Sequence, residues 1–225
     1  MRPSLPALLF ILMSAASCAA WDPDYEQNPD TSLRELLEPL QEQDTSIDPM
    51  MIERVRFAVE QLATRHPGHV PSQVAAATLA METDEPQRAQ GYIDRALSLD
   101  PANIEARCIR IRIAVADGSL DLARSIIDAG LRLRPDAAAL YESSAWLHQL
   151  HERFDDALQA LDTAEALDAP AWRIQFHRGL IEELRMNYDA AKSHYEAAIN
   201  DNKDCLQAQR RLAGLRARQQ ILQGR

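Results

Sequence analysis

Three histidines have the spacing that comes nearest to a metal site. His148 and His151 lie three residues apart, and His177 lies in the next stretch with helical character. Imidazoles at i and i+3 of one helix can share a zinc ion with a ligand from a neighbouring helix. The competing interpretation is that His148 packs between helices and His151 lies in a turn, and we favour it. A zinc hydrolase is therefore the weaker hypothesis, and no cofactor is predicted.

Other signs of catalysis or nucleic-acid binding are missing from the sequence. It contains no nucleophile elbow, phosphate-binding loop or paired-histidine protease motif. Only 7 residues are glycine, which leaves little material for Gly-rich cofactor loops. The net charge of −10 disfavours phosphate backbones as partners. The sequence predicts a protein that is not an enzyme and binds no nucleic acid.

Cys18 follows a segment that is typical of a bacterial export signal. Residues 1–17 contain the positive Arg2, an apolar stretch over residues 5–13 and small residues at 14–17. The apolar stretch is shorter than the ~20 residues that span a bilayer. The residues Ala-Ala-Ser-Cys that end at Cys18 resemble a lipobox, which implies acylation of Cys18 as the first mature residue.

The residues after Cys18 bear on where the protein would reside. Ala19 stands where an aspartate would indicate inner-membrane retention, so we expect an outer-membrane anchor that faces the periplasm. Residues 18–31 include the acidic segment WDPDYEQNPD, which we interpret as a tether. Ordinary cleavage after Ala19 or Ala20 is the alternative, and it would give a soluble periplasmic protein.

Prolines recur with a fixed period. Pro67, Pro101 and Pro135 are spaced by 34 residues, and Pro170 lies beside the next step. Each follows an apolar stretch rich in Ala, Leu and Ile, a composition that favours helices. Because proline cannot continue a helix, the pattern predicts helix ends at a fixed interval.

Small and large apolar residues repeat with the same period. The pattern small-x3-large-x2-small recurs as Ala89, Ile93 and Ala96; as Ala123, Ile127 and Gly130; as Ala157, Leu161 and Ala164; and as Ala191, Tyr195 and Ala198. Small residues let helix axes approach closely, and large residues fill the adjacent gap. Stacked copies of a helix pair can then bury one continuous face.

The period and its residue types resemble the tetratricopeptide family. The likeness is strongest over residues 179–198, through Gly179, Tyr188, Ala191, Tyr195 and Ala198. It implies an all-α, right-handed superhelical solenoid of antiparallel helix pairs. Four repeats would cover residues 70–103, 104–137, 138–171 and 172–205, with a capping helix over 206–225. Residues 32–69 would form N-terminal helices that could belong to a degenerate repeat.

Two segments depart from a regular pattern. Ser32 to Glu35 form a capping-box pattern that predicts the start of a short first helix, which Pro39 interrupts. In the second copy, Ile111 replaces the small residue of the first helix, so this copy is expected to pack differently.

The resemblance also implies that the first helices of the pairs line a concave groove that holds a segment of another protein. By register, this groove comprises Thr78, Met81, Arg112, Val115, Glu142, Trp146, Gln149, Arg173, Phe176, Leu180, Glu183 and Arg210. Trp146, with Arg112 in the copy before and Phe176 in the copy after, has hot-spot composition. The alternative is that Trp146 is buried between repeats.

A clamp for chaperone tails, as some relatives have, needs Lys, Arg and Asn in the groove. Val74, Thr78 and Ile109 stand where that clamp would begin, so we reject this mode. The mixed charge of the groove instead suggests a peptide or helical segment with apolar and charged side chains.

These patterns predict a non-catalytic scaffold or adaptor at the bacterial cell envelope, within an assembly complex and attached to the membrane by lipid at Cys18. The alternative is a homo-oligomer whose groove holds a second copy or the chain's own N-terminal segment. Leu33, Leu36, Leu37 and Leu40 could supply the apolar face of that segment.

Overall fold

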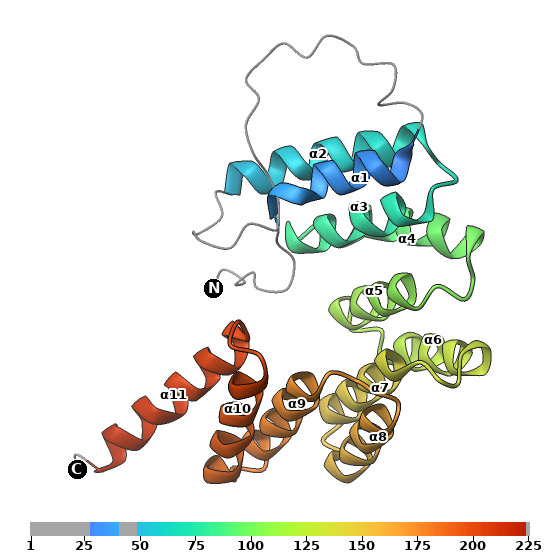
Figure 1. Cartoon of the computed structure of the whole chain (residues 1–225). Coiled ribbons are helices and arrows are strands. Elements are labelled where there is room, and N and C mark those ends of the chain that lie inside the picture. Colours follow the sequence, from blue (N-terminus) through green and yellow to red (C-terminus); the bar gives the residue numbers. More distant parts are fainter. Residues whose placement is uncertain (1–27, 41–48, 224–225) are drawn as a thin grey trace. The chain divides into compact units, whose positions relative to one another are not determined.

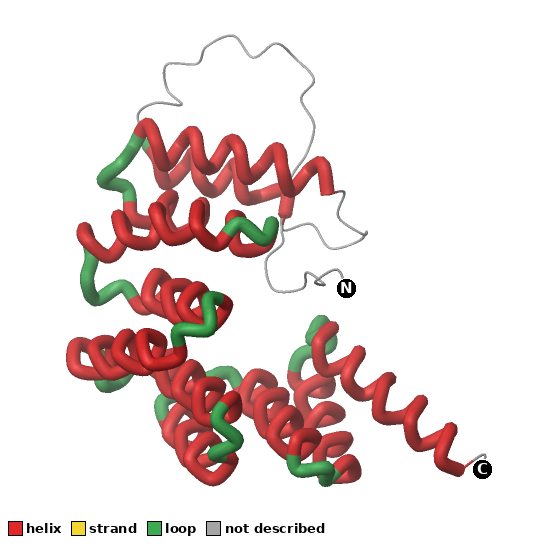
Figure 2. The backbone as a smooth tube through the Cα atoms, turned by 180° about the vertical axis from the view of Figure 1, so that it is seen from behind, coloured by secondary structure: helices red, strands yellow, loops and turns green. Residues whose placement is uncertain are grey.

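The computed structural model of the chain describes residues 28–40 and 49–223, which form helices and no strand (Figures 1 and 2). The export signal, Cys18 and most of the predicted tether lie outside the described residues. The helices are α1 (Pro29–Leu37), the 3-10 helix η2 (Glu38–Leu40), α2 (Pro49–Arg65), α3 (Val70–Glu82), α4 (Pro86–Leu99), α5 (Ile104–Ala116), α6 (Leu120–Leu133), α7 (Ala138–Leu150), α8 (Phe154–Ala166), α9 (Ala171–Leu184), α10 (Tyr188–Asp201) and α11 (Leu206–Gln223). The all-α prediction is confirmed. None of these helices has the length and apolar character of a membrane span.

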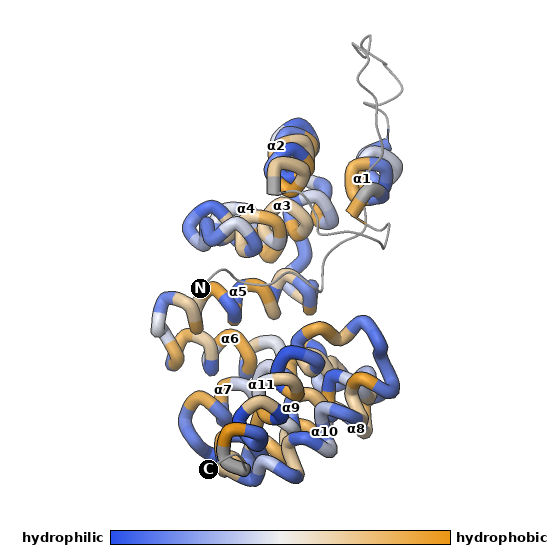
Figure 3. The backbone as a smooth tube through the Cα atoms, turned by 90° about the vertical axis from the view of Figure 1, so that its left-hand side faces the viewer, coloured by the Kyte–Doolittle hydropathy of each residue, from blue (hydrophilic) through white to orange (hydrophobic). Residues whose placement is uncertain are grey.

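The chain divides into two compact units, with the boundary between Ser119 and Leu120. This boundary falls within the second predicted repeat, residues 104–137, in which Ile111 departs from the family pattern. Each helix carries both hydrophobic and hydrophilic residues (Figure 3), as expected for helices that bury one face.

In the first unit, α1 packs against α2 and α3. Leu33 and Leu40 are buried with Val55, Val59 and other apolar residues of α2 and α3. Leu36 and Leu37 are partly buried against the same cluster. The N-terminal leucines are therefore part of the core of this unit.

Helix α1 begins earlier than the sequence indicated. It starts at Pro29, within the range assigned to the tether, and Asn28 is its N-cap. The Asn28 side chain accepts hydrogen bonds from the backbone N–H groups of Asp30 and Thr31, at 3.1 and 3.4 Å. Proline at the first helical position is favourable after such a cap, so the capping box at Ser32 does not open this helix.

In the second unit, α7 packs on α8 and α9 packs on α10. The small-large-small residues of the two second helices are fully buried: Ala157, Leu161 and Ala164 in α8, and Ala191, Tyr195 and Ala198 in α10. The periodic residues therefore form the core that joins each pair. Helix α11 packs on α10.

The turns between the first and second helix of each pair recur with the same 34-residue period as the helices. A residue with positive φ stands at Asp84, Gly118, Glu152 and Met186, at intervals of 34. The next residue donates its backbone N–H to a carbonyl five positions earlier, as from Asn187 to Glu182 at 2.8 Å. This is the hydrogen bond of a left-handed helix C-cap. The same turn therefore sets the direction of each second helix.

Candidate functional site

The predicted groove residues lie on the first helices of both units. Those of the second unit, which we call the first-helix face, are Glu142, Trp146 and Gln149 on α7, Arg173, Phe176, Leu180 and Glu183 on α9, and Arg210 on α11. Helices α7 and α9 contact each other directly. Thr78, Met81, Arg112 and Val115 belong to the first unit. Arg112 and Trp146 therefore belong to different units, and their proximity remains a prediction.

Trp146 is half-buried on α7. Tyr141, Phe154 and Leu158 pack against the buried core of this helix pair. Because Trp146 is only half-buried, part of its indole is accessible. A partly exposed tryptophan can provide a large contact area for a partner.

Glu142 and Arg173 form an ion pair across adjacent first helices. Arg173 Nε lies 2.8 Å from Glu142 Oε2, and the contact is an ion pair without a hydrogen bond to this oxygen. The Glu142 side chain is only 4% exposed and that of Arg173 is 41% exposed. Burial raises the pKa of Glu142, and the guanidinium of Arg173 opposes this rise. The acid is therefore buried beneath an arginine that remains accessible.

We expect Arg173→Ala to lower the free energy of unfolding by about 1–2 kcal/mol at pH 7, because Glu142 would stay buried and charged without a partner. Loss of the arginine should raise the pKa of Glu142 further. The penalty should then be smaller below this pKa, where the carboxyl is neutral, and grow as pH rises through it. Urea unfolding of wild type and Arg173→Ala at pH 4.5 and 7.5 measures how the stability penalty changes with pH. Adding Glu142→Gln to Arg173→Ala should restore stability at pH 7.5, and a penalty that persists would contradict this account.

Phe176, Leu180 and Glu183 take part in the core of the second unit. Phe176 and Leu180 are partly buried against the cluster that joins α10 to α11, and the Phe176 ring centroid lies 6.0 Å from that of Tyr195. The Tyr195 hydroxyl donates a hydrogen bond of 2.6 Å to Glu183. Burial, together with this bond, raises the pKa of Tyr195. These three residues therefore support the face as well as line it.

Arg211 is a residue of this region that the sequence did not indicate. Its guanidinium lies 3.3 Å from Glu183, and both Arg211 and Arg210, which was predicted for the groove, are exposed. Arg210 and Arg211 are neighbours in the sequence, so the packing of α11 alone decides which of them reaches Glu183 on α9. The same kind of pair recurs in the first unit, where Arg112 of α5 lies 3.4 Å from Glu82 of α3. Consecutive first helices are thus linked repeatedly by an acid and a more exposed arginine.

Thr78 is less accessible than a groove requires. Thr78 is buried and donates its hydroxyl hydrogen bond to the Val74 carbonyl at 2.9 Å. Met81 is partly buried against the core of α3 to α5. In the second unit, Gln149 is partly exposed.

The three histidines of the zinc hypothesis are dispersed. Burial lowers the pKa of His148 and that of His177, and both Nδ1 atoms are buried without a hydrogen bond. His151 is exposed at the end of α7. Across the described residues, no group of three or more His, Cys, Asp or Glu side chains is arranged to hold a metal ion.

The stacked pairs define an α-helical repeat protein. A family model described as tetratricopeptide repeat matches residues 74–138 and 144–191, which together make up half of the chain. The chain therefore belongs to the tetratricopeptide repeat family, whose members generally mediate protein–protein interactions on a non-catalytic scaffold. No curated protein matches the sequence.

Solved structures share this fold at low sequence identity. TTC0263, a thermophilic TPR protein in Thermus thermophilus, is 18% identical with a TM-score of 0.66, over 74% of this chain and 91% of that chain. A tetratricopeptide repeat protein from Parabacteroides merdae ATCC 43184 is 16% identical with a TM-score of 0.65, over 73% and 64%. A chain of the APC/C hetero-tetramer Cut9-Hcn1 is 14% identical with a TM-score of 0.63, over 75% and 34%. These likenesses establish the solenoid fold and leave the partner open.

Proposed function

We propose that the protein is a non-catalytic adaptor that binds a segment of another envelope protein on the first-helix face of its second unit. The observation that carries the proposal is the half-buried Trp146 on α7, next to the helix that presents Arg173. An accessible indole and guanidinium are the side chains most enriched in binding hot spots.

The chemistry of the face indicates what kind of segment it takes. Trp146 offers apolar area and the exposed Arg210 offers positive charge, while Arg173 is paired with Glu142 and Arg211 with Glu183. A peptide or helix with apolar residues and at least one carboxylate would complement these groups.

The binding test compares wild-type protein with Trp146→Ala in pull-downs from native bacterial envelopes. The variant should recover at least about tenfold less of the specific partner, since a buried aromatic anchor contributes about 2 kcal/mol or more. Met186→Ala is the matched control, because Met186 is 73% exposed in the turn before α10, outside the face. Equal recovery with Trp146→Ala, at unchanged helical content, would move the binding surface elsewhere.

The location we propose is the outer membrane on its periplasmic side, through acylation at Cys18. The support is the export signal and the lipobox-like residues before Cys18. We expect wild-type protein to incorporate labelled palmitate and sediment with membranes, and Cys18→Ser to do neither. Release of wild-type, unlabelled protein in the soluble periplasmic fraction would support ordinary cleavage instead.

The alternative function is self-association. Phe57 on α2 is 62% exposed and lines a cavity of about 260 Å³ together with Leu36 of α1. A second copy could cover this apolar surface. Light scattering separates the two functions, because an adaptor keeps a monomeric mass as its concentration rises and a homo-oligomer does not.

A further inference from the structure

Within the described helices, three ion pairs link consecutive first helices, and each joins an acid to an arginine. The acids of two of these pairs have some access to water, since the Glu82 side chain is 20% exposed and that of Glu183 is 25% exposed. The Glu142 side chain, which is paired with Arg173, is only 4% exposed. Glu142 is therefore the acid whose charge depends most on its arginine.

The carboxylate of Glu142 is poorly stabilised where it lies. Its Oε2 atom is buried and has no hydrogen bond, so Arg173 compensates the charge only as an ion-pair partner. By contrast, Glu183 also accepts the hydrogen bond of the Tyr195 hydroxyl. Burial raises the pKa of Glu142 despite the nearby guanidinium. The cost of burial falls on the carboxylate, and the neutral carboxyl would largely escape it.

Arg173 is accessible to a second acceptor. Its side chain is 41% exposed, and it contacts Glu142 through Nε. Trp146 lies one helical turn beyond Glu142 on α7, and residues four apart on a helix are neighbours on its surface. The arginine and the accessible indole thus share one part of the first-helix face. A segment that contacts Trp146 can bring a carboxylate to Arg173.

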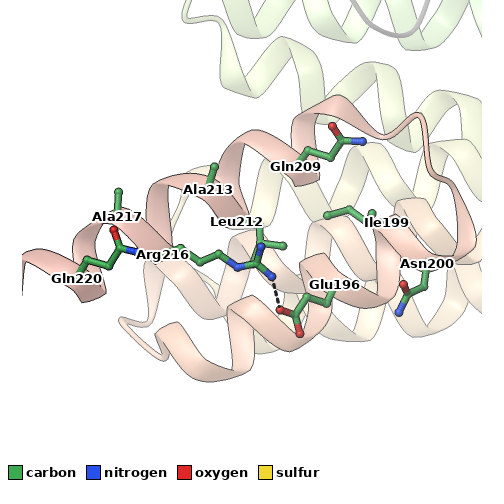
Figure 4. A pocket seen from close by; sticks show the side chains of 9 residues that line it. All are labelled: Glu196, Ile199, Asn200, Gln209, Leu212, Ala213, Arg216, Ala217 and Gln220. Carbon is green, nitrogen blue, oxygen red and sulfur yellow. Dashed lines mark hydrogen bonds and ion pairs between the residues drawn. The ribbon is translucent and has the colours of Figure 1, made fainter. Parts of the chain in front are cut away.

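The charged groups on the surrounding helices are engaged elsewhere. Those of α8 to α11 form further ion pairs: Arg153 with Asp156, Arg178 with Asp162 and Glu165, Arg185 with Asp155, and Arg216 with Glu196 (Figure 4). Burial lowers the pKa of His148, and the charges of Arg153 and of Arg124 on α6 add to this effect. His177 interacts with Arg173, but burial lowers its pKa to about 4, so it is neutral above pH 5. Glu142 is therefore the group beside Arg173 that can gain a proton between pH 5 and 7.5.

We propose that a carboxylate of the partner segment binds Arg173 in exchange for Glu142, and that Glu142 takes up a proton from water as it is released. The proposal rests on the first-helix face being the binding surface, and it gives that surface a ligand group and a pH dependence. Exchange without the proton would leave Glu142 buried and charged with no partner, which is strongly unfavourable. Protonation removes this charge, so binding and proton uptake occur together.

Binding should strengthen as pH falls. Loss of its arginine raises the pKa of Glu142 further, so the complex holds a proton at a pH where the free protein does not. Between these two pKa values the affinity should rise by up to about tenfold per unit of pH, and outside this interval it should be constant. Below about pH 4 the carboxylate of the ligand is itself protonated, and binding should be lost.

The test uses the full chain and phenylacetate, which combines an aromatic ring with a carboxylate that stays ionised at pH 5.5. Binding is measured from the NMR chemical shift of the Trp146 indole N–H, assigned by comparison with Trp146→Phe. Phenylacetate should bind about tenfold more tightly at pH 5.5 than at pH 7.5. Phenylacetamide, the neutral analogue, should bind equally weakly at both pH values.

Variants of the protein assign the proton to Glu142. Glu142→Gln should bind phenylacetate at both pH values as tightly as wild type does at pH 5.5. Adding Arg173→Gln to Glu142→Gln should abolish the preference for phenylacetate over phenylacetamide, and this double variant leaves no buried charge unpaired. Glu82→Gln is the matched control, because it neutralises the acid of the similar pair in the first unit and should leave the pH dependence unchanged.

Two results would overturn the proposal. The first is absent or equal binding of phenylacetate to wild type at pH 5.5 and 7.5, and the second is a pH dependence that persists in Glu142→Gln. Neither result would remove the adaptor function, which requires only that recovery of the partner from envelopes depends on Trp146.

Discussion

Replacing Gly179 by alanine should lower the free energy of unfolding by up to about 2 kcal/mol. The added Cβ would lie 2.6 and 2.7 Å from two ring carbons of Tyr195, closer than packed carbons approach. The ring cannot move aside easily, because Tyr195 is fully buried and its hydroxyl is bonded to Glu183. Overpacking of this kind costs about 1–3 kcal/mol, and the gain of about 1 kcal/mol from replacing a helical glycine offsets only part of it.

Two further variants make the Gly179 prediction specific. Gly214→Ala should raise stability by up to about 1 kcal/mol, since Gly214 is in a helix with no neighbouring atom within 4 Å of the new Cβ. Gly179→Ala should be better tolerated together with Tyr195→Leu, because the pair Ala145 and Leu161 shows that the chain accommodates this combination. Urea unfolding of the four-member cycle measures the coupling. Equal costs for Gly179→Ala in both backgrounds would contradict the proposed overlap with Tyr195.

Acid should destabilise the folded chain through His177. Burial lowers the pKa of His177 from 6.5 to about 4, and the charge of Arg173 adds to the effect. Although the residue keeps some exposed area, Nδ1 is buried and without a hydrogen bond. The unfolded chain binds a proton near pH 6.5 and the folded chain does not. Stability is therefore complete above pH 6.5 and declines as pH falls, by about 3 kcal/mol when pH 4 is passed.

Unfolding by urea between pH 8 and pH 4 measures the contribution of His177. His177→Leu should reduce the slope below pH 6.5 by the largest amount of any histidine substitution, although His148 and His194, whose pKa values are also lowered by burial, act in the same direction. His151→Gln is the control at an exposed position. A slope below pH 6.5 that is the same in wild type and His177→Leu would show that His177 is accessible to protons in the folded state.

The parts of the fold that the sequence revealed are those governed by local rules. Helix α11 begins at Leu206, which is the first residue of the capping helix that the pattern predicts. The start of α1 was not found, because Asn28 and Pro29 lie in an acidic stretch that also has the composition of a linker. The N-cap of α1 depends on two hydrogen bonds of the Asn28 side chain, which cannot be inferred from amino-acid composition.

The site was less accessible to sequence reasoning than the helices. Register placed Trp146, Glu142 and Arg173 on first helices, but it could not show that Glu142 is buried beneath Arg173. The pair joins residues 31 positions apart, so it depends on how two helices stack and not on local sequence. The division at Ser119 has the same cause: contacts between repeats are tertiary, and Ile111 alone gave a sign of irregularity.

Site-specific photocross-linking tests the adaptor function most directly. A photoreactive amino acid would replace Trp146 in one strain and Gln159, which is exposed on α8, in another. Binding on the first-helix face predicts a discrete cross-linked partner in native envelopes from position 146 and none from position 159. Cross-links of equal yield from both positions, or from position 159 alone, would contradict it.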